Sequence, residues 1–224
     1  MTDVPQRAAP ESGVRVGERR WPMALAVIVA ALLQVVVPHK GRVAIWWVFP
    51  LVEVVVLGVL MIRDPGRIDR RSRGLRLLTL WMIGLITLAN TVGAGILIYD
   101  IISKAPDVNG NALLGRGAAI WVTNIIVFSL WYWELDRGGP AERAAGTSVP
   151  PTFAFPEDAT PELVPDGWFP MFPDYLFVSF TTATAFSPTD TLPLKTWAKM
   201  TMMAESGISL TLAVLVISRA INTI

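Results

Sequence analysis

Six stretches of the chain are rich in apolar residues and are separated by polar or proline-rich segments. They run over residues 21–38, 43–62, 77–101, 117–133, 175–185 and 197–221. A helix needs about 20 apolar residues to cross a bilayer. Five of the stretches come close to that length, and the one at 175–185 falls well short of it. The pattern predicts an all-α polytopic membrane protein with five transmembrane helices.

The short stretch at 175–185 differs from a simple membrane anchor. It carries several threonines, and a polar segment at 186–193 separates it from the last apolar stretch. Non-helical backbone is tolerated at membrane depth only where protein or water covers it. We therefore expect residues 174–224 to form a re-entrant half-helix, a turn and a final transmembrane helix.

Arginines between the second and third apolar stretches indicate the orientation. Residues 63–76 hold six arginines against two aspartates. The six are Arg63, Arg67, Arg70, Arg71, Arg73 and Arg76. Such a loop stays in the cytoplasm and attracts anionic lipid headgroups, so membrane lipids rather than nucleic acid are the expected partners. We predict a multi-pass protein of the bacterial inner membrane with a disordered cytoplasmic N-terminus, residues 1–20.

The fourth apolar stretch completes a four-helix transmembrane region, residues 21–134. Trp131, Tyr132 and Trp133 at its end predict an interfacial aromatic belt. Residues 136–173 then hold eight prolines and six acids against two bases. A segment of this composition buries little apolar surface, so residues 135–173 are expected to form an extended, acidic linker.

Side chains that could carry out chemistry are few. The chain has no cysteine, which excludes disulfides and thiolate metal sites. Its single histidine, His39, stands beside Lys40 and is expected to be interfacial, since metal sites need clusters of ligands. We find no phosphate-binding glycine loop, nucleophile elbow or catalytic triad. Neither enzymatic activity nor a cofactor or metal is expected.

Two glutamates lie inside predicted transmembrane helices. Glu53 is near the middle of the second, and Glu205 is one turn before Ser209 in the last. A carboxylate at membrane depth costs on the order of 3 kcal/mol to insert, so each should face protein or water, or carry a proton. Glu53 could be a proton or cation site, or a structural carboxylate satisfied by a neighbouring helix. Glu205 could neutralise Lys199 or cap the end of the half-helix, or it could lie beside a cation pathway. Asp190 is similarly either a loop cap or an entry charge for cations.

The C-terminal residues follow a known pattern of Ser-Phe-x-Thr-x-Thr, filter, Asp-x-x-Pro. The matching positions are Ser179, Phe180, Thr182, Thr184, Asp190 and Pro193. Residues 174–224 thereby resemble the pore helix, filter and inner helix of two-span potassium channels. The resemblance implies a pore loop, and one loop cannot ring a pore, so conduction implies a homo-oligomer of cyclic symmetry.

The segment that corresponds to the filter departs from that family. Where the channels have Thr-Val-Gly-Tyr-Gly, this chain has Ala185-Phe186-Ser187-Pro188-Thr189. The glycines that allow the filter backbone are absent, and Pro188 fixes one backbone angle. A potassium-selective ladder of carbonyls is therefore not expected.

The layout of most of the chain resembles a second group, bacterial multi-span membrane proteins of unassigned activity. The shared features are an arginine-rich loop after two spans, a proline-rich linker and a Phe-Thr-rich half-helix before the last span. With the arginine loop inside, the half-helix enters from the cytoplasmic face, whereas potassium channels present their pore loop from outside. Either the orientation is inverted or the channel resemblance is only architectural.

Two functions remain open from the sequence. The first is channel-like or transporter-like passage or binding of a monovalent cation or proton through the C-terminal region. Its ion-pathway candidates are Glu53, Thr182, Thr184, Asp190, Glu205 and Ser209. The alternative is a non-conducting membrane scaffold or accessory subunit. A pathway predicts water around Glu53 or Glu205, and a scaffold predicts that both acids are dry and hydrogen-bonded.

Overall fold

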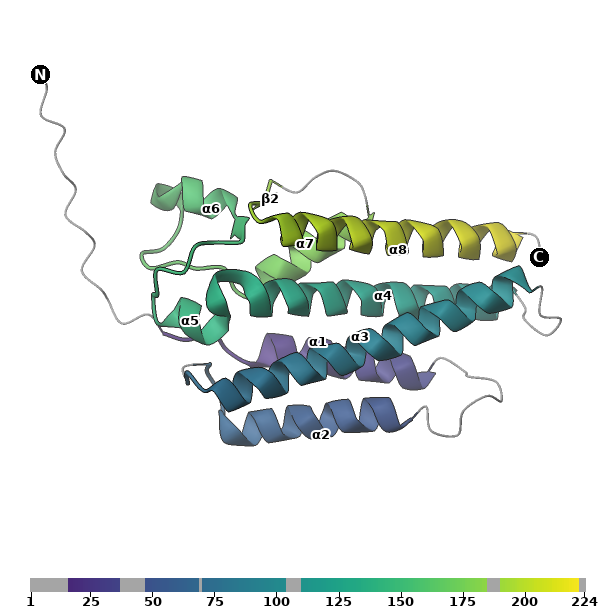
Figure 1. Cartoon of the computed structure of the whole chain (residues 1–224), viewed down its shortest axis with the longest axis horizontal. Helices are drawn as coiled ribbons and strands as arrows, with labels where there is room; N and C mark the ends of the chain where they lie inside the picture. Colours follow the sequence, from purple (N-terminus) through teal and green to yellow (C-terminus); the bar gives the residue numbers. More distant parts are fainter. Residues whose placement is uncertain (1–15, 37–46, 69, 104–109, 185–189, 222–224) are drawn as a thin grey trace, which may run out of the picture.

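The computed structural model describes residues 16–36, 47–68, 70–103, 110–184 and 190–221. Its long helices lie side by side along one axis, and a shorter helix, α7, lies beside α4 and α8 (Figure 1). These elements are α1 (Trp21–Val36), α2 (Val48–Arg63), α3 (Arg73–Ile102), α4 (Gly110–Leu135), α7 (Phe172–Thr184) and α8 (Thr196–Ile221). His39 and the segment 185–189 that replaces the filter lie outside the described residues.

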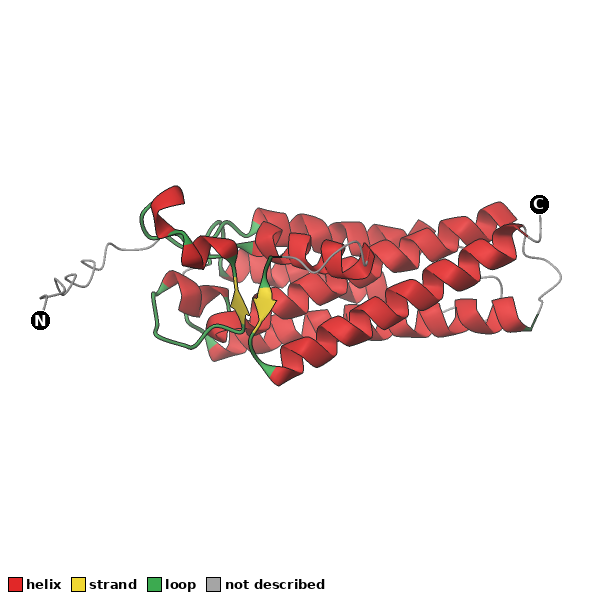
Figure 2. Cartoon of the chain, turned by 90° about the horizontal axis from the view of Figure 1, so that it is seen from above, coloured by secondary structure: helices red, strands yellow, loops and turns green. Residues whose placement is uncertain are grey.

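Short elements gather at one end of the bundle. They are η1 (Asp136–Gly138), α5 (Pro140–Ala144), β1 (Phe153–Ala154), α6 (Pro156–Ala159), η2 (Pro161–Leu163) and β2 (Leu192–Pro193). The two strands pair antiparallel, with Phe153 opposite Pro193, at the end where α8 begins (Figure 2). This pairing joins the segment after α4 to the segment that precedes α8.

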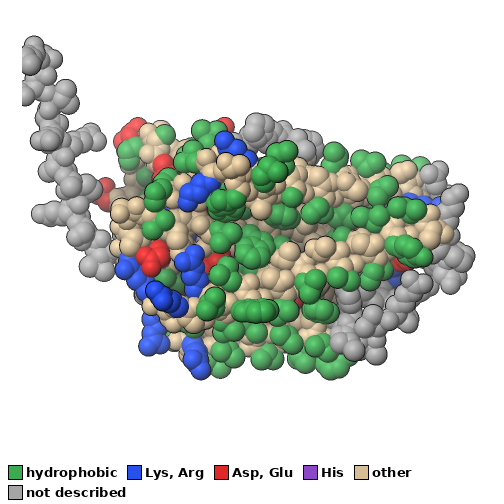
Figure 3. Space-filling view, in the orientation of Figure 1, with side chains coloured by type: hydrophobic (Ala, Val, Ile, Leu, Met, Phe, Trp, Pro, Cys, Tyr) green, Lys and Arg blue, Asp and Glu red, His purple; other side chains and the backbone are tan. Residues whose placement is uncertain are grey.

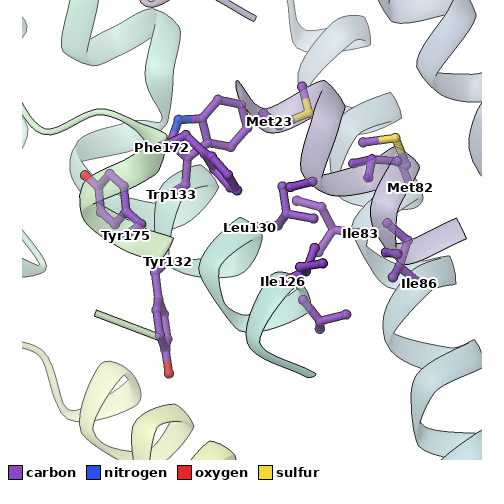
Figure 4. Close-up of a cluster of buried hydrophobic side chains, with 14 of the residues drawn as sticks. Met23, Met82, Ile83, Ile86, Ile126, Leu130, Tyr132, Trp133, Phe172 and Tyr175 are labelled. Carbon is purple, nitrogen blue, oxygen red and sulfur yellow. The ribbon is translucent and has the colours of Figure 1, made fainter. Parts of the chain in front are cut away.

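Helix α4 is the centre of the bundle, since it packs against α1, α3, α7 and α8. Leu130 and Trp133 of α4 are almost fully buried, and they pack with side chains from three other helices (Figure 4). The neighbours in this cluster include Met23 of α1, Met82, Ile83 and Ile86 of α3, and Phe172 and Tyr175 of α7. The central helix thereby fixes the positions of the helices around it.

The helical character predicted from the apolar stretches is confirmed, and the length and composition of the helices are compatible with a membrane protein. Among the described residues, three helical segments are long and apolar enough to cross a membrane: Arg73–Ile102, Asn111–Gly138 and Thr196–Arg219. Helices α1 and α2 are apolar but have 16 residues each. Hydrophobic side chains cover much of the outer surface along the helices, while most lysines and arginines in this view gather at the end that carries α5 and α6 (Figure 3).

Residues 135–173 depart from the extended linker that their composition predicts. Asp136 accepts hydrogen bonds from the backbone N–H of Thr152 (2.6 Å) and from the hydroxyl of Tyr175 (2.6 Å). Phe153 is fully buried, with ring centroids 5.1 Å from Tyr132 and 6.4 Å from Tyr175. The segment folds because a few of its side chains find partners on α4 and α7, although it has too few apolar residues to form a core of its own.

Candidate functional site

Helices α7 and α8 run side by side in the same direction. Ser179 of α7 lies against Glu205 of α8. About one turn further along α7, the carbonyl of Thr182 accepts from the hydroxyl of Ser206, the residue after Glu205 (3.0 Å). The strand pair at the start of α8 lies at the end of the bundle where α7 also begins. The chain therefore enters the bundle in α7, returns to the same end and enters again in α8.

Glu205 is the polar centre of the contact between α4, α7 and α8. Its side chain is 0% exposed. The hydroxyl of Tyr132 donates to its Oε2 atom (2.6 Å), and Ser179 Oγ makes a short hydrogen bond with its Oε1 atom. The ring of Tyr132 points away from Leu130 (Figure 4) and carries its hydroxyl to Glu205 of α8. Among the described residues, no lysine, arginine or histidine forms an ion pair with Glu205.

The hydroxyl of Ser179 has two partners and only one hydrogen. Its oxygen is 2.7 Å from the carbonyl oxygen of Ile125 and is also hydrogen-bonded to Glu205. A hydroxyl donates once and accepts on its lone pairs. Both contacts are satisfied together when Glu205 carries a proton and donates it to Ser179, which then donates to Ile125. An ionised Glu205 would compete with that carbonyl for the same hydrogen.

A second layer of polar side chains lies one turn along α8 from Glu205. Asn124 donates to the hydroxyl of Ser209 (3.2 Å) and accepts from the amide of Asn90 on α3 (3.3 Å). All three side chains are buried. Buried amides and hydroxyls are stable only when paired, so this ladder ties α3, α4 and α8 into one register.

Of the predicted pathway residues, Glu205 and Ser209 lie one turn apart on α8, and the carbonyl of Thr182 on α7 accepts from Ser206, the residue after Glu205. The hydroxyl of Thr182 is used within α7, where it donates to the carbonyl of Val178 (2.7 Å). Thr184 is half-buried and donates to its own helix in the same way, and Asp190 is exposed. The hydroxyls of both threonines therefore bond to backbone carbonyls of their own helix.

Glu53 belongs to a different part of the bundle. Helix α2 packs against α1 and α3, and the side chain of Glu53 is 0% exposed. The amide of Gln34 on α1 donates to both of its carboxyl oxygens, at 3.1 Å each. This pair joins α1 to α2 and does not contribute to the polar cluster around Glu205.

Tyr132 is a residue of the site whose position in the sequence predicts a different role. Its position beside two tryptophans predicts an interfacial anchor, yet both Tyr132 and Trp133 are buried. The indole N–H of Trp133 donates to Glu18 (2.8 Å), which precedes α1 and also accepts from the backbone N–H of Phe172. A run of three aromatics encircles a helix, so part of it must face inward wherever the helix is surrounded by others.

The described residues contain no group of three or more histidine, aspartate or glutamate side chains that could hold a metal ion. In comparisons with protein-family models, curated proteins and solved structures, nothing matches this chain. The functional argument therefore depends on the geometry around Glu205.

Proposed function

We propose that the protein is an integral membrane protein with five transmembrane helices, in which α7 is a re-entrant half-helix and Glu205 binds a proton. The length of α7 supports this arrangement. Its 13 residues rise about 20 Å, whereas the apolar core of a bilayer is about 30 Å thick. The return of the chain to the end where α7 begins is the path expected of a re-entrant segment.

One observation carries the assignment of Glu205: a fully buried carboxyl group held by two hydroxyls, with no cationic side chain in the described residues to neutralise it. An ionised carboxylate is costly to bury without a counter-charge. The group must therefore carry a proton or hold a small cation. The shared hydrogen of Ser179 favours the proton, because only the protonated acid satisfies Ser179 and Ile125 together.

Transfer of this proton across the membrane requires a change of conformation, since Glu205 is sealed between α4, α7 and α8. A displacement of α7 from α8 would break the contacts of Ser179 and Ser206 and open the carboxyl to water. In this proposal the protein works as a channel or transporter for protons or monovalent cations in the bacterial inner membrane, as a cyclic homo-oligomer, with its N-terminus and arginine loop in the cytoplasm.

Ion flux into proteoliposomes tests the proposal. Wild-type protein is compared with Glu205→Gln and with Glu53→Gln as the matched control, under proton, sodium and potassium gradients. We expect proton flux that Glu205→Gln abolishes and Glu53→Gln retains. Glutamine can accept from Tyr132 and donate to Ser179 but cannot release a proton. A variant that remains folded therefore tests the loss of the titratable proton without the loss of these hydrogen bonds. Equal flux in wild type and Glu205→Gln would refute the assignment.

A second function, a non-conducting scaffold or accessory subunit, is favoured by a separate observation. Glu53 and Glu205 are both fully buried and hydrogen-bonded to neighbouring side chains. For a scaffold we expect no flux under any gradient from well-folded protein. Both variants should then differ from wild type only in stability.

A further inference from the structure

A cavity of about 330 Å³ lies at the arginine-rich end of the bundle, and neither Glu205 nor its partners Tyr132 and Ser179 line it. Its walls are the loop before α3, the first turns of α3, the end of α4 and the segment 138–142. The volume is within the range of about 300–1,000 Å³ that is typical of small-ligand sites. We call it the arginine cavity.

Arginine side chains dominate the charge of the arginine cavity. Its lining includes five arginines and three acids. Each acid is paired with one arginine: Arg20 with Asp64 at 2.5 Å, Arg71 with Glu142 at 3.4 Å and Arg76 with Glu134 at 3.4 Å. Arg70 and Arg73 remain without a carboxylate among the described residues. The cavity therefore has two uncompensated positive charges.

Some hydrogen-bond donors of the arginines that line the cavity have no acceptor among the described residues. The side chain of Arg73 forms no hydrogen bond or ion pair with the described residues, and the side chain of Arg70 donates only to the carbonyl of Arg63 (3.2 Å). The Nε atom of Arg20 is buried and has no hydrogen-bond partner, although its Nη2 atom holds Asp64. A buried donor without an acceptor is costly, and a bound anion would satisfy it. The N-terminus of α3, capped by Ser72, adds its partial positive charge.

We propose that the arginine cavity binds a phosphate group, which is the anion whose charge and acceptor oxygens match two guanidinium groups that have no carboxylate partner among the described residues. Two molecules could supply it: the headgroup of an anionic phospholipid, or a soluble phosphate compound. The cavity separates the six loop arginines into two sets. Arg70, Arg71, Arg73 and Arg76 line it, whereas Arg63 and Arg67 do not. Arg67 is used structurally, since it donates to the carbonyl of Gly17 (3.1 Å).

The test compares Arg73→Gln with Arg63→Gln in the full chain. Both arginines are exposed, flank the same loop at the end of α2 and the start of α3, and lose the same charge on substitution, but only Arg73 lines the cavity. One arm titrates inorganic phosphate against chloride at equal ionic strength and follows the melting temperature in detergent. The other measures retention of phosphatidylglycerol against phosphatidylcholine by native mass spectrometry of protein from nanodiscs.

We expect saturable binding of one phosphate-bearing molecule, weakened about tenfold by Arg73→Gln and less than about twofold by Arg63→Gln. Saturation by inorganic phosphate identifies a soluble ligand, and selective retention of phosphatidylglycerol identifies a lipid. Equal losses in the two variants would show diffuse surface attraction and overturn the proposal, as would the absence of saturable binding in both arms. Proton flux tests Glu205 separately, because Arg73 does not contact that cluster.

Discussion

The contact between α4 and α8 at Gly117 gives the sharpest test of the arrangement that encloses Glu205. A Cβ atom placed on Gly117 lies 2.7 Å from Cγ2 and 2.8 Å from Cγ1 of Val216. Carbon atoms in favourable contact are about 3.5–4.0 Å apart, so alanine at this position overlaps Val216 by close to 1 Å or more. The two helices approach this closely only because residue 117 is glycine.

We expect Gly117→Ala to lower the free energy of unfolding by about 1–2 kcal/mol. Overpacking a tight contact costs about 1–3 kcal/mol, and the better helix propensity of alanine offsets up to about 1 kcal/mol of that cost. The matched control is Gly115→Ala, two residues earlier in α4, where an added Cβ meets nothing within 4 Å. This control should be neutral or more stable than wild type.

A double-mutant cycle with Val216→Ala shows whether the clash is the cause. In the presence of Val216→Ala, the added methyl group of Gly117→Ala fits the vacated space, so the double variant should be more stable than the sum of the two effects by about 1 kcal/mol. Reversible unfolding in mixed micelles measures all four proteins. Equal effects of Gly117→Ala and Gly115→Ala, or strict additivity in the cycle, would refute the α4–α8 contact.

Three further predictions concern polar contacts. Tyr132→Phe should lower the free energy of unfolding by about 1–3 kcal/mol, measured in the same micelles, because a buried Glu205 oxygen loses its donor; an unchanged stability would contradict that hydrogen bond. Asp136→Ala should release the segment 145–171 from the bundle, and limited proteolysis should then cut it faster than in wild type; equal cleavage rates would show that Asp136 does not hold it. Burial raises the pKa of Glu18, so the folded state keeps a proton that the unfolded state has lost as the pH rises above the ordinary range of glutamate. The contribution of Glu18 to stability is therefore lost as the pH rises through its folded pKa, and Glu18→Gln should flatten the pH dependence of unfolding; parallel curves for the two proteins would exclude this linkage.

The long helices could be predicted because their signal is local. The apolar stretches at 77–101 and 197–221 correspond closely to α3 and α8, and the short stretch at 175–185 corresponds to α7. A run of apolar residues forms a helix wherever its backbone must satisfy its own hydrogen bonds. The composition and length of an apolar stretch are then sufficient to predict that it forms a helix.

The contacts that define the site could not be predicted in the same way. The sequence marks Glu205 as unusual, but its partners Tyr132 and Ser179 lie 73 and 26 residues away along the chain. Whether a tyrosine at a helix end faces lipid or protein depends on which helix packs beside it. The fold of residues 135–173 has the same origin. Asp136 accepts from Thr152, 16 residues away, and from Tyr175 of α7, while Phe153 packs against Tyr132 of α4 and Tyr175.

The pairing of β1 with β2 constrains how the protein can be made. The pairing encloses α7 between Ala154 and Leu192. Glu205, which is hydrogen-bonded to Ser179 of α7, is synthesised 26 residues after it. A short helix with several hydroxyl groups gains little from entering lipid alone. We therefore expect α7 to remain at the membrane surface during synthesis. It should enter the bundle only after α8 has been inserted, as a late step of biogenesis.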